Sequence, residues 1–234
     1  MDAVNPDDQV WPPGSFLGRL SGAERSELLA LGITRALRPD THLFVEGMHD
    51  THVEVIRQGY VKVTTAVGGL PQLLAIRLPG DLVGESAAVT GNSRSATVTT
   101  CGRVVSTVIR QADFLRFIAA HPRVAHQVTA SVGDQLRWAN ARRSDFAAFP
   151  VHVRLARVLG DIASGCGEAA GDGVLIGVQL NHIELATLIG AAEDSVQKAL
   201  RMLRLRGLIK TGYRRITVLD PAGLRSLVDE AERP

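Results

Sequence analysis

The chain has 234 residues, of which 45% are hydrophobic and 21% are charged. This balance is typical of a globular protein with a buried core and argues against disorder, and the length is enough for one large or two ordinary domains. The formal net charge of +2 is too small to indicate a nucleic-acid or membrane partner, so evidence for either must come from the local distribution of charge.

Cysteine content and hydropathy limit the classes further. The two cysteines, Cys101 and Cys166, are too few for a four-cysteine iron–sulfur or zinc site. The sequence does not open with an apolar signal segment, and its longest apolar runs fall well short of the roughly 18 residues that cross a membrane. We therefore expect a cytoplasmic protein with free thiols and no membrane partner.

The N-terminal part predicts an arm followed by a helix. Residues 1–14 contain three prolines and no hydrophobic periodicity, which predicts a flexible arm. Ser21 and Glu24 have the spacing of a capping box ahead of a leucine-rich segment, and Gly32 can end the helix.

Short runs of alternating apolar and polar residues occupy about residues 41–110. They include HVEVI, YVKVTTA, LLAIRL, ATVTT and VVSTVI. Glycines such as Gly59 and Gly102 separate them. Regular strands between turns predict an antiparallel sandwich or barrel.

A helical pattern follows Arg110. Pro122 can occupy the first turn of a helix, and apolar residues then recur at spacings of three, four or seven as far as Phe149, which predicts a helix about 40 Å long. Its apolar stripe can pack on its own β domain, but we favour parallel pairing with a second copy in a homodimer. Pro150 marks a hinge or boundary, and a Gly-rich stretch at residues 163–174 separates the next helix from the C-terminal region.

Residues 180–220 carry the clearest local signal. Asn181 and Glu184 form a capping pair, Gly190 permits a tight turn, and a second helix is expected at about residues 193–206. Two short helices joined through glycine predict a helix-turn-helix, and the segments GLIKTG and RITVLD after it predict a two-stranded wing. The apolar face of the first helix is expected to comprise Ile183, Leu185, Ala186, Leu188 and Ile189.

Positive charge is concentrated on the same region. Seven cationic residues and no acidic residue lie between Ser195 and Arg215. A solvated helix face is the usual explanation of such a run, but here the run coincides with a helix-turn-helix pattern, which favours contacts to DNA phosphates. The seven are Lys198, Arg201, Arg204, Arg206, Lys210, Arg214 and Arg215.

The order of these parts resembles the CRP/FNR family of transcription regulators over roughly residues 15–225. The resemblance rests on LFVEGMHDTHVEVIRQGYVKV, on LPGDLVGES with SRSATV, and on IELATLIGAAEDSVQKALRMLRLRGLI. It implies an α+β fold: a flexible arm (1–14), an antiparallel, jelly-roll-like β-roll that binds cyclic nucleotides (15–120), a long dimerisation helix with a hinge (121–149) and a winged helix-turn-helix (150–234). It further implies a homodimer that binds double-stranded DNA at a palindromic operator, with RNA polymerase as a further partner, and no enzymatic activity.

The segment GESAAVTGNSRSATV contains the expected ligand site. Backbone N–H groups at the start of a short helix at residues 86–89, with Arg94 opposite, would cradle a phosphate. By resemblance, Glu85 accepts from a ribose 2′-hydroxyl while Arg94 and Ser95 hold a cyclic phosphate, so cAMP is the leading effector, and no cofactor is required. The alternative is an internal salt bridge between Glu85 and Arg94 that closes an empty roll. The expected ligand-binding residues are Gly84, Glu85, Ser86, Arg94, Ser95 and Asn140.

One departure from the family concerns the base of the ligand. In cAMP-responsive relatives the long helix presents a hydroxyl pair, or a Thr-Asn pair, to the adenine, where this chain has Ala139 and Asn140. The missing hydroxyl removes a hydrogen bond worth about 0.5 to 1.5 kcal/mol. Trp138 beside this pair can stack on a base or lie in the dimer interface.

A second departure concerns the recognition helix. Family members that bind the best-known operator begin it with Ser-Arg-Glu-Thr-Val, where this chain has AEDSV at residues 192–196. Glu193 replaces an arginine whose contact to guanine is worth about 1 to 3 kcal/mol of discrimination, so the DNA target should differ at that base pair. Ala192 also lacks the capping hydroxyl. The expected DNA-binding residues are Asp194, Ser195, Gln197, Lys198, Arg201 and Arg214.

A metalloenzyme is the competing class. His49, His52 and Glu54 superficially resemble the metal motif of a cupin-type enzyme on a similar β-roll. His49 falls in a turn, however, and the second half of such a site should offer another histidine where this chain has PGDLVGES. Surface histidines explain the motif better, and a haem sensor is also disfavoured. We therefore expect no metal site and no catalytic residues.

Overall fold

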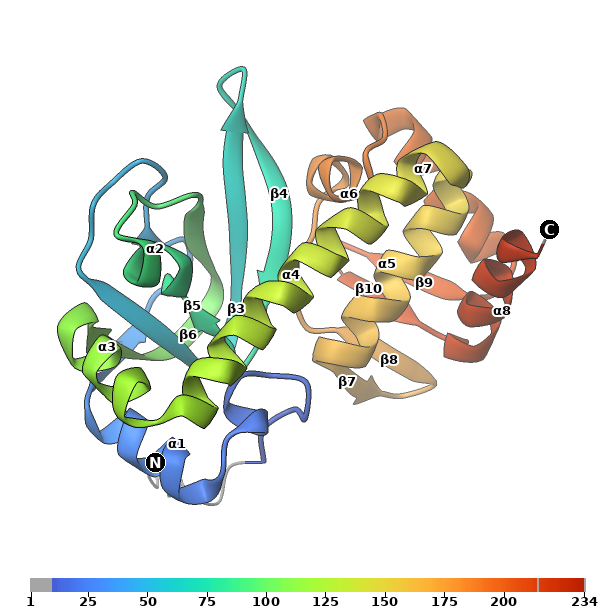
Figure 1. Ribbon diagram of the computed structural model, residues 1–234. Helices are drawn as coiled ribbons and strands as arrows, with labels where there is room; N and C mark the ends of the chain where they lie inside the picture. The colour runs from blue at the N-terminus through green and yellow to red at the C-terminus, as the bar shows by residue number, and fades with distance from the viewer. Residues whose placement is uncertain (1–9, 214, 234) are drawn as a thin grey trace. The chain divides into compact units, whose positions relative to one another are not determined.

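The computed structural model describes residues 10–213 and 215–233, and the chain in it forms two compact units (Figure 1). The first unit extends to Arg137, apart from residues 72–74, and the second begins at Trp138. The first unit is a β domain with short helices, and the second combines helices with a small sheet. The predicted α+β class is confirmed.

A six-stranded sheet forms the body of the first unit. Strands β1, β6, β3 and β4 follow one another in this order, β2 also pairs with β6, and β5 also pairs with β3. Strand β6 is antiparallel to β1, β2 and β3. The strands are β1 (Ile33–Leu37), β2 (His42–Phe44), β3 (His52–Val67), β4 (Leu70–Arg77), β5 (Leu82–Val83) and β6 (Thr97–Arg110), and the helices are η1 (Leu17–Arg19), α1 (Gly22–Ala30), α2 (Glu85–Thr90) and α3 (Gln111–Ala120).

Gly59 and Gly102 lie inside strands, so their prediction as separators of strands was wrong. Their φ angles are +78° and +93°, and β3 and β6 continue through them. The register of β3 against β6 shifts twice between Ile56 and Tyr60, which is the mark of a β-bulge. A Cβ on Gly59 would lie 2.2 Å from the carbonyl oxygen of Arg103, so only glycine permits this approach of the two strands.

Residues 11–14 do not form the predicted loose arm. Trp11 is only 4% exposed and belongs to the same buried cluster as Phe16 and Leu17. Burial of an indole removes about 150–250 Å² of surface from water, which outweighs the loop signal of the neighbouring prolines. Residues 1–9 of the predicted arm lie outside the described residues.

Both predicted capping boxes are present. The Ser21 side chain accepts from the backbone N–H of Glu24 (3.3 Å), while the Glu24 carboxylate accepts from the N–H of Ser21 (2.8 Å). Asn181 and Glu184 make the same reciprocal pair at 2.8 and 2.9 Å. Each box satisfies two donors that a helix start otherwise leaves unpaired.

The predicted long helix is α4 (Pro122–Ala148). Its apolar stripe has a buried part and an exposed part. Val124 and Val128 are buried in the core cluster of the first unit, so packing on its own β domain accounts for the start of the stripe. Val132 and Leu136 are 39% and 61% exposed. This second part of the stripe is solvent-exposed in a single chain.

In the second unit the two segments predicted as a wing, residues 209–212 and 215–218, pair as an antiparallel hairpin, and two further strands extend it to a four-stranded sheet. The Gly-rich stretch at residues 163–174 forms the end of α5 and most of a hairpin, which the Gly171 turn closes at φ +60°. The sheet order is β7-β8-β10-β9, with antiparallel neighbours. The elements are α5 (Val151–Cys166), β7 (Gly167–Ala170), β8 (Gly173–Ile176), α6 (His182–Ile189), α7 (Glu193–Leu205), β9 (Ile209–Gly212), β10 (Arg215–Val218) and α8 (Pro221–Glu232). No helix in the described part of the chain has the length and apolarity that crossing a membrane requires.

Candidate functional site

A cavity of about 90 Å³ lies in the first unit at the start of α2. It is smaller than the ~300 Å³ at which pockets for drug-sized ligands begin, so it can enclose part of a nucleotide, and the remainder would project from it. Phe44, Arg77 and Gln135 contribute to its lining. Five predicted ligand-binding residues line it as well: Gly84, Glu85, Ser86, Arg94 and Ser95.

Gly84 is a lining residue of the cavity. It precedes α2 in the left-handed conformation, with φ +84°. A Cβ at this position would lie 2.7 Å from Nη1 of Arg94 and 2.8 Å from Cζ of Phe44. Glycine is therefore required both by the backbone conformation and by the close approach of two buried side chains.

Arg94 is held in a fixed orientation and is 4% exposed. Its Nη1 donates to the carbonyl oxygen of Gly84 (3.0 Å) and its Nη2 to that of His52 (2.6 Å). Its Nε lies 3.4 Å from the Asp50 carboxylate, and its guanidinium carbon lies 3.8 Å from the centre of the Phe44 ring. A guanidinium has five N–H donors, so one on each Nη remains for a ligand, which suits bidentate contact to a phosphate.

Glu85 is 5% exposed, and its Oε1 accepts from Nε2 of Gln135 on α4 (3.1 Å). Burial raises the pKa of this carboxyl, although its own backbone N–H, the charge of Arg77 and the Gln135 amide oppose the shift. Within the described residues no ion pair joins Glu85 to Arg94, so the structure does not show the salt bridge considered as the alternative.

Replacement of Glu85 by glutamine should reveal its titration. Its folded-state pKa lies above the ordinary value of 4.5, so between these two values the folded protein binds more protons than the unfolded chain. The contribution of Glu85 to the free energy of unfolding must then fall as the pH rises through this window. We expect urea denaturation to show the stability of the wild type declining relative to Glu85→Gln as the pH rises from 4.5 towards neutrality. A constant difference would contradict the raised pKa.

Gln135 is the residue that α4 contributes to the described lining of the cavity, and sequence reasoning missed it. The predicted residue, Asn140, is exposed on α4 and belongs to the second unit. Trp138 lies next to it in sequence, and the Arg142 guanidinium covers its ring at 3.6 Å from the ring centre. A cation therefore covers one face of the Trp138 ring, the side chain that was predicted to stack on a base or to lie in the dimer interface.

The turn between α6 and α7 is built from glycine and two arginines. Gly190 ends α6 with φ +60°. Nη1 of Arg154 donates to the carbonyl oxygens of Ile189 (2.8 Å) and Gly190 (3.0 Å), and Nη1 of Arg142 donates to that of Leu188 (3.0 Å). Burial lowers the pKa of Arg142 to about 10, which leaves it protonated at neutral pH. The arginines satisfy carbonyls that the helix end leaves unpaired.

Helix α7 presents the predicted DNA-binding residues to solvent. Ser195 is partly exposed, whereas the predicted inward positions Val196, Leu200 and Leu203 are buried. Ala192 has no side-chain oxygen and, as predicted, makes no capping hydrogen bond at the start of α7. Arg214 lies outside the described residues. The exposed members are Asp194, Gln197, Lys198 and Arg201.

The histidine motif considered for a metalloenzyme belongs to a buried polar network. Glu54 is fully buried, accepts from Oγ of Ser106 (2.5 Å) and pairs with Arg35, and Nε2 of His52 lies 3.5 Å from it. Across the described residues, no three His, Cys, Asp or Glu side chains are grouped so that they could hold a metal ion. The carboxylate is thus already committed to protein donors.

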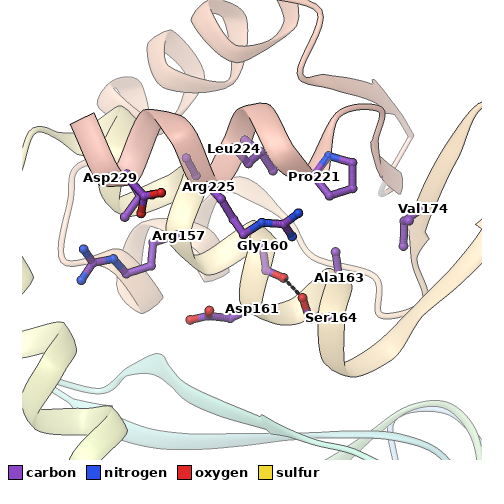
Figure 2. Close-up of a pocket in the computed structure, with 12 residues that line it drawn as sticks. Arg157, Gly160, Asp161, Ala163, Ser164, Val174, Pro221, Leu224, Arg225 and Asp229 are labelled. Atoms are coloured by element: carbon purple, nitrogen blue, oxygen red, sulfur yellow. Dashed lines mark hydrogen bonds between the residues drawn. The ribbon is translucent and has the colours of Figure 1, made fainter. Parts of the chain in front are cut away.

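A second cavity, of about 320 Å³, lies between α5 and α8 in the second unit (Figure 2). Its lining is largely small and apolar around Gly160, whose carbonyl oxygen accepts from Oγ of Ser164 (2.9 Å). Of the charged groups at its edge, Arg157 pairs with Asp145 (2.7 Å). None of the predicted ligand-binding or DNA-binding residues described in the structure lines it.

Gly160→Ala should stabilise the protein. Gly160 is inside α5, and a Cβ at this position would meet no atom within 4 Å. Alanine in a helix interior is favoured over glycine by about 0.5–1 kcal/mol. We expect urea denaturation to show a gain of this size. Gly167→Ala is the contrasting variant, because its Cβ would lie 2.2 Å from the Ala163 carbonyl oxygen and should destabilise.

Comparisons with known proteins agree with this architecture. Residues 34–121 match the model of the cyclic nucleotide-binding domain, and residues 153–227 match that of the Crp-like helix-turn-helix domain. The CRP-like cAMP-activated global transcriptional regulator of Mycobacterium tuberculosis is 28% identical over 209 residues, covering 87% of this chain and 92% of the relative. The cyclic AMP receptor protein of Thermus thermophilus is 26% identical over 187 residues, covering 79% and 83%.

Solved structures give the same result. The crystal structure of a CRP-family transcriptional regulator from Thermus thermophilus superposes with a TM-score of 0.69 at 25% identity, covering 83% of this chain and 96% of that one. Domain order, fold and relatives therefore coincide: a cyclic nucleotide-binding domain precedes a Crp-like helix-turn-helix domain, and the relatives regulate transcription. The chain belongs to the CRP/FNR family of transcription regulators.

Proposed function

We propose that the chain is a homodimeric, sequence-specific DNA-binding regulator controlled by a cyclic nucleotide, with cAMP as the leading effector, that binds in the β-roll. The carrying observation is the cavity that brings Glu85, Ser86, Arg94 and Ser95 together. The name of the Mycobacterium tuberculosis relative, which describes it as cAMP-activated, supports the choice of effector. The same regulator with another ligand, or with none, is the second candidate.

The cyclic phosphate would lie against Arg94. Arg94 lines the cavity together with Ser86 and Ser95, two exposed residues whose hydroxyls would donate to the same phosphate. The carboxylate of Glu85 would accept from the ribose 2′-hydroxyl. Because Arg94 is already oriented by protein acceptors, little side-chain entropy would be lost on binding.

Gln135 gives the ligand a route to α4. Its amide donates to the Glu85 oxygen in the empty cavity (3.1 Å), so a ribose hydroxyl that reaches Glu85 would share or replace this contact. The contact joins the cavity directly to the predicted dimerisation helix. The effector can shift the protein only by the difference in its affinity for the two states of that helix.

The exposed part of the α4 stripe supports a dimer. Val132 and Leu136 occur at four-residue spacing and are both exposed, which is how one side of a helix–helix seam appears in a single chain. A parallel pair of α4 helices would place two α7 helices on a palindromic operator with half-sites about 34 Å apart. Asp194, Ser195, Gln197, Lys198, Arg201 and Arg214 would contact DNA there.

The regulator would act in the cytoplasm, where RNA polymerase would be a further partner. As in its relatives, its role would be regulation of transcription and not catalysis.

Isothermal titration of the purified dimer with cAMP and cGMP tests the proposal, with Arg94→Ala and Glu85→Ala as variants and Gly91→Ala as a folded control outside the cavity lining. Micromolar binding that both cavity variants abolish is the expected result. An operator selected from random DNA by the wild type then tests whether ligand changes DNA affinity. Folded, dimeric protein that gives no heat with either nucleotide would exclude cyclic nucleotide control by these two ligands.

A further inference from the structure

The cavity between α5 and α8 has no part in the proposed function (Figure 2). Its volume of about 320 Å³ lies at the lower end of the ~300–1,000 Å³ range of small-molecule sites, so it can hold a compact ligand. A Cβ added to Gly160, on its α5 wall, would meet no atom within 4 Å. The two helices therefore leave open space at a point where side chains normally interdigitate.

The lining of this cavity is apolar apart from its charged edge. The apolar residues come from both helices and from β8: Ala156, Ala163, Val174, Pro221, Leu224 and Val228. The hydroxyl of Ser164 donates to the carbonyl oxygen of Gly160 (2.9 Å), so its hydrogen is already used. A polar ligand body would leave its groups unpaired against these walls, whereas an aliphatic body would remove apolar surface from water on both sides.

Two charges of opposite sign lie on opposite walls of the cavity and are not paired. Arg225 belongs to α8 and Asp161 to α5, and Figure 2 shows Arg225 extending from α8 towards α5. Within the described residues neither side chain makes a hydrogen bond or an ion pair. Arg157, the other arginine of the lining, differs because it pairs with Asp145 (2.7 Å) and with Glu232.

A ligand that bridges the two walls must carry one charge of each sign. Loss of hydrating water raises the pKa of the Asp161 carboxyl, although the charges of Arg142 and Arg157 oppose this shift, so a cation beside Asp161 would be favoured. Asp229 is a further unpaired carboxylate of the lining, but it lies on the same helix as Arg225. A ligand anion at Arg225 and a ligand cation at Asp161 would therefore connect α8 to α5.

We propose that this cavity binds an α-amino acid with an aliphatic side chain. The Arg225 guanidinium holds its carboxylate, Asp161 holds its ammonium group, and its side chain lies over Gly160 between the apolar walls. The ligand ties α8 to α5, whose Arg154 donates to the carbonyl oxygens of the turn before α7 (2.8 and 3.0 Å). Binding here stabilises the DNA-binding unit directly and does not depend on the nucleotide site of the β-roll.

Titration calorimetry with leucine and two of its fragments provides the test. Isoamylamine lacks the carboxylate of leucine, and isocaproate lacks its ammonium group. The loss of one charge-assisted contact should weaken binding by about tenfold, so leucine should bind at least about tenfold more tightly than either fragment. Arg225→Gln should lower the affinity for leucine to that for isoamylamine and leave isoamylamine unchanged. Asp161→Asn should do the same with respect to isocaproate.

Arg233→Gln is the matched control, because Arg233 is an exposed arginine directly after α8 that does not belong to the described lining. It removes the same charge and should leave all three affinities unchanged. Gly160→Leu should fill the cavity and abolish leucine binding, with circular dichroism as the check on its fold. Arg225→Gln and Asp161→Asn change exposed residues, so they decide the matter if Gly160→Leu does not fold.

Three results would overturn the inference. Isoamylamine that binds as tightly as leucine would show that the cavity takes a simple amine. Leucine affinity that survives both Arg225→Gln and Asp161→Asn would show that these charges do not hold the ligand. The absence of heat with leucine, at concentrations that saturate a site of millimolar Kd, would show that the cavity does not bind this class of ligand.

Discussion

Gly84→Ala should abolish nucleotide binding, with an affinity loss of at least about 100-fold, equal to roughly 2.8 kcal/mol. The new Cβ would lie 2.7 Å from Nη1 of Arg94 and 2.8 Å from the Phe44 ring, and both side chains are buried. Arg94 must then leave its hydrogen bonds to the carbonyl oxygens of Gly84 and His52. Each charge-assisted bond of this kind is worth about 1.5–3 kcal/mol, so a displaced guanidinium can no longer present its fork to a phosphate.

Gly91→Ala separates this steric effect from backbone strain. Gly84 and Gly91 flank the same helix, α2, and both are left-handed, with φ of +84° and +73°. A Cβ on Gly91 would meet nothing within 4 Å. Both variants should therefore lose about 1–2 kcal/mol of stability to the left-handed conformation, but only Gly84→Ala should lose the ligand. Equal nucleotide affinity of the two variants by calorimetry would show that Arg94 does not hold the ligand.

Features determined by near neighbours in sequence were predictable. The two capping boxes join residues three positions apart, and the turn at Gly190 depends on one left-handed residue. The recognition of Glu85 and Arg94 as cavity residues used a segment of fifteen residues, 84–98. In each case the relevant contacts or conformations lie within one short stretch, so the local pattern contains the information.

The prediction of the apolar face of α6 is wrong at one position, Ile183. Ile183 is 57% exposed, although it was placed on the apolar face. Successive helical residues are about 100° apart, so a residue two positions before Leu185 points some 200° away from it. Leu185, Leu188 and Ile189 share a face at spacings of three and four and are buried. The helical period alone therefore places Ile183 on the exposed face.

Other features depend on contacts that span long stretches of chain. Gln135 reaches Glu85 across 50 residues, and Arg77 joins the cavity from the end of a strand that lies outside the ligand motif. Gly59 is a bulge because of the opposing carbonyl of Arg103, which no local pattern contains. Trp11 is buried by a core assembled from several distant elements. Such positions are settled by tertiary burial, which overrides turn and loop propensity.

Gly190→Ala should be the most damaging small substitution for DNA binding. Gly190 forms the turn between α6 and α7 at φ +60°, and a Cβ there would lie 2.9 Å from three atoms of the Phe146 ring. The Phe146 ring, which is 43% exposed, must move or the turn must open, and an opened turn changes the angle of α7. We expect a stability loss of about 2–3 kcal/mol from left-handed strain plus the displaced ring.

The loss of specific DNA affinity should reach about 100-fold, because a rotated recognition helix misplaces at least two base contacts of about 1–3 kcal/mol each. Fluorescence anisotropy with an operator selected by the wild type measures it. Gly207→Ala is the matched control: Gly207 is also left-handed, at φ +71°, but its Cβ would meet nothing within 4 Å. It should show the strain and keep α7 in place. If both variants bind the operator equally well, contact with Phe146 does not set the orientation of the recognition helix, and the arginines that bind the α6 carbonyls, Arg142 and Arg154, must set it instead.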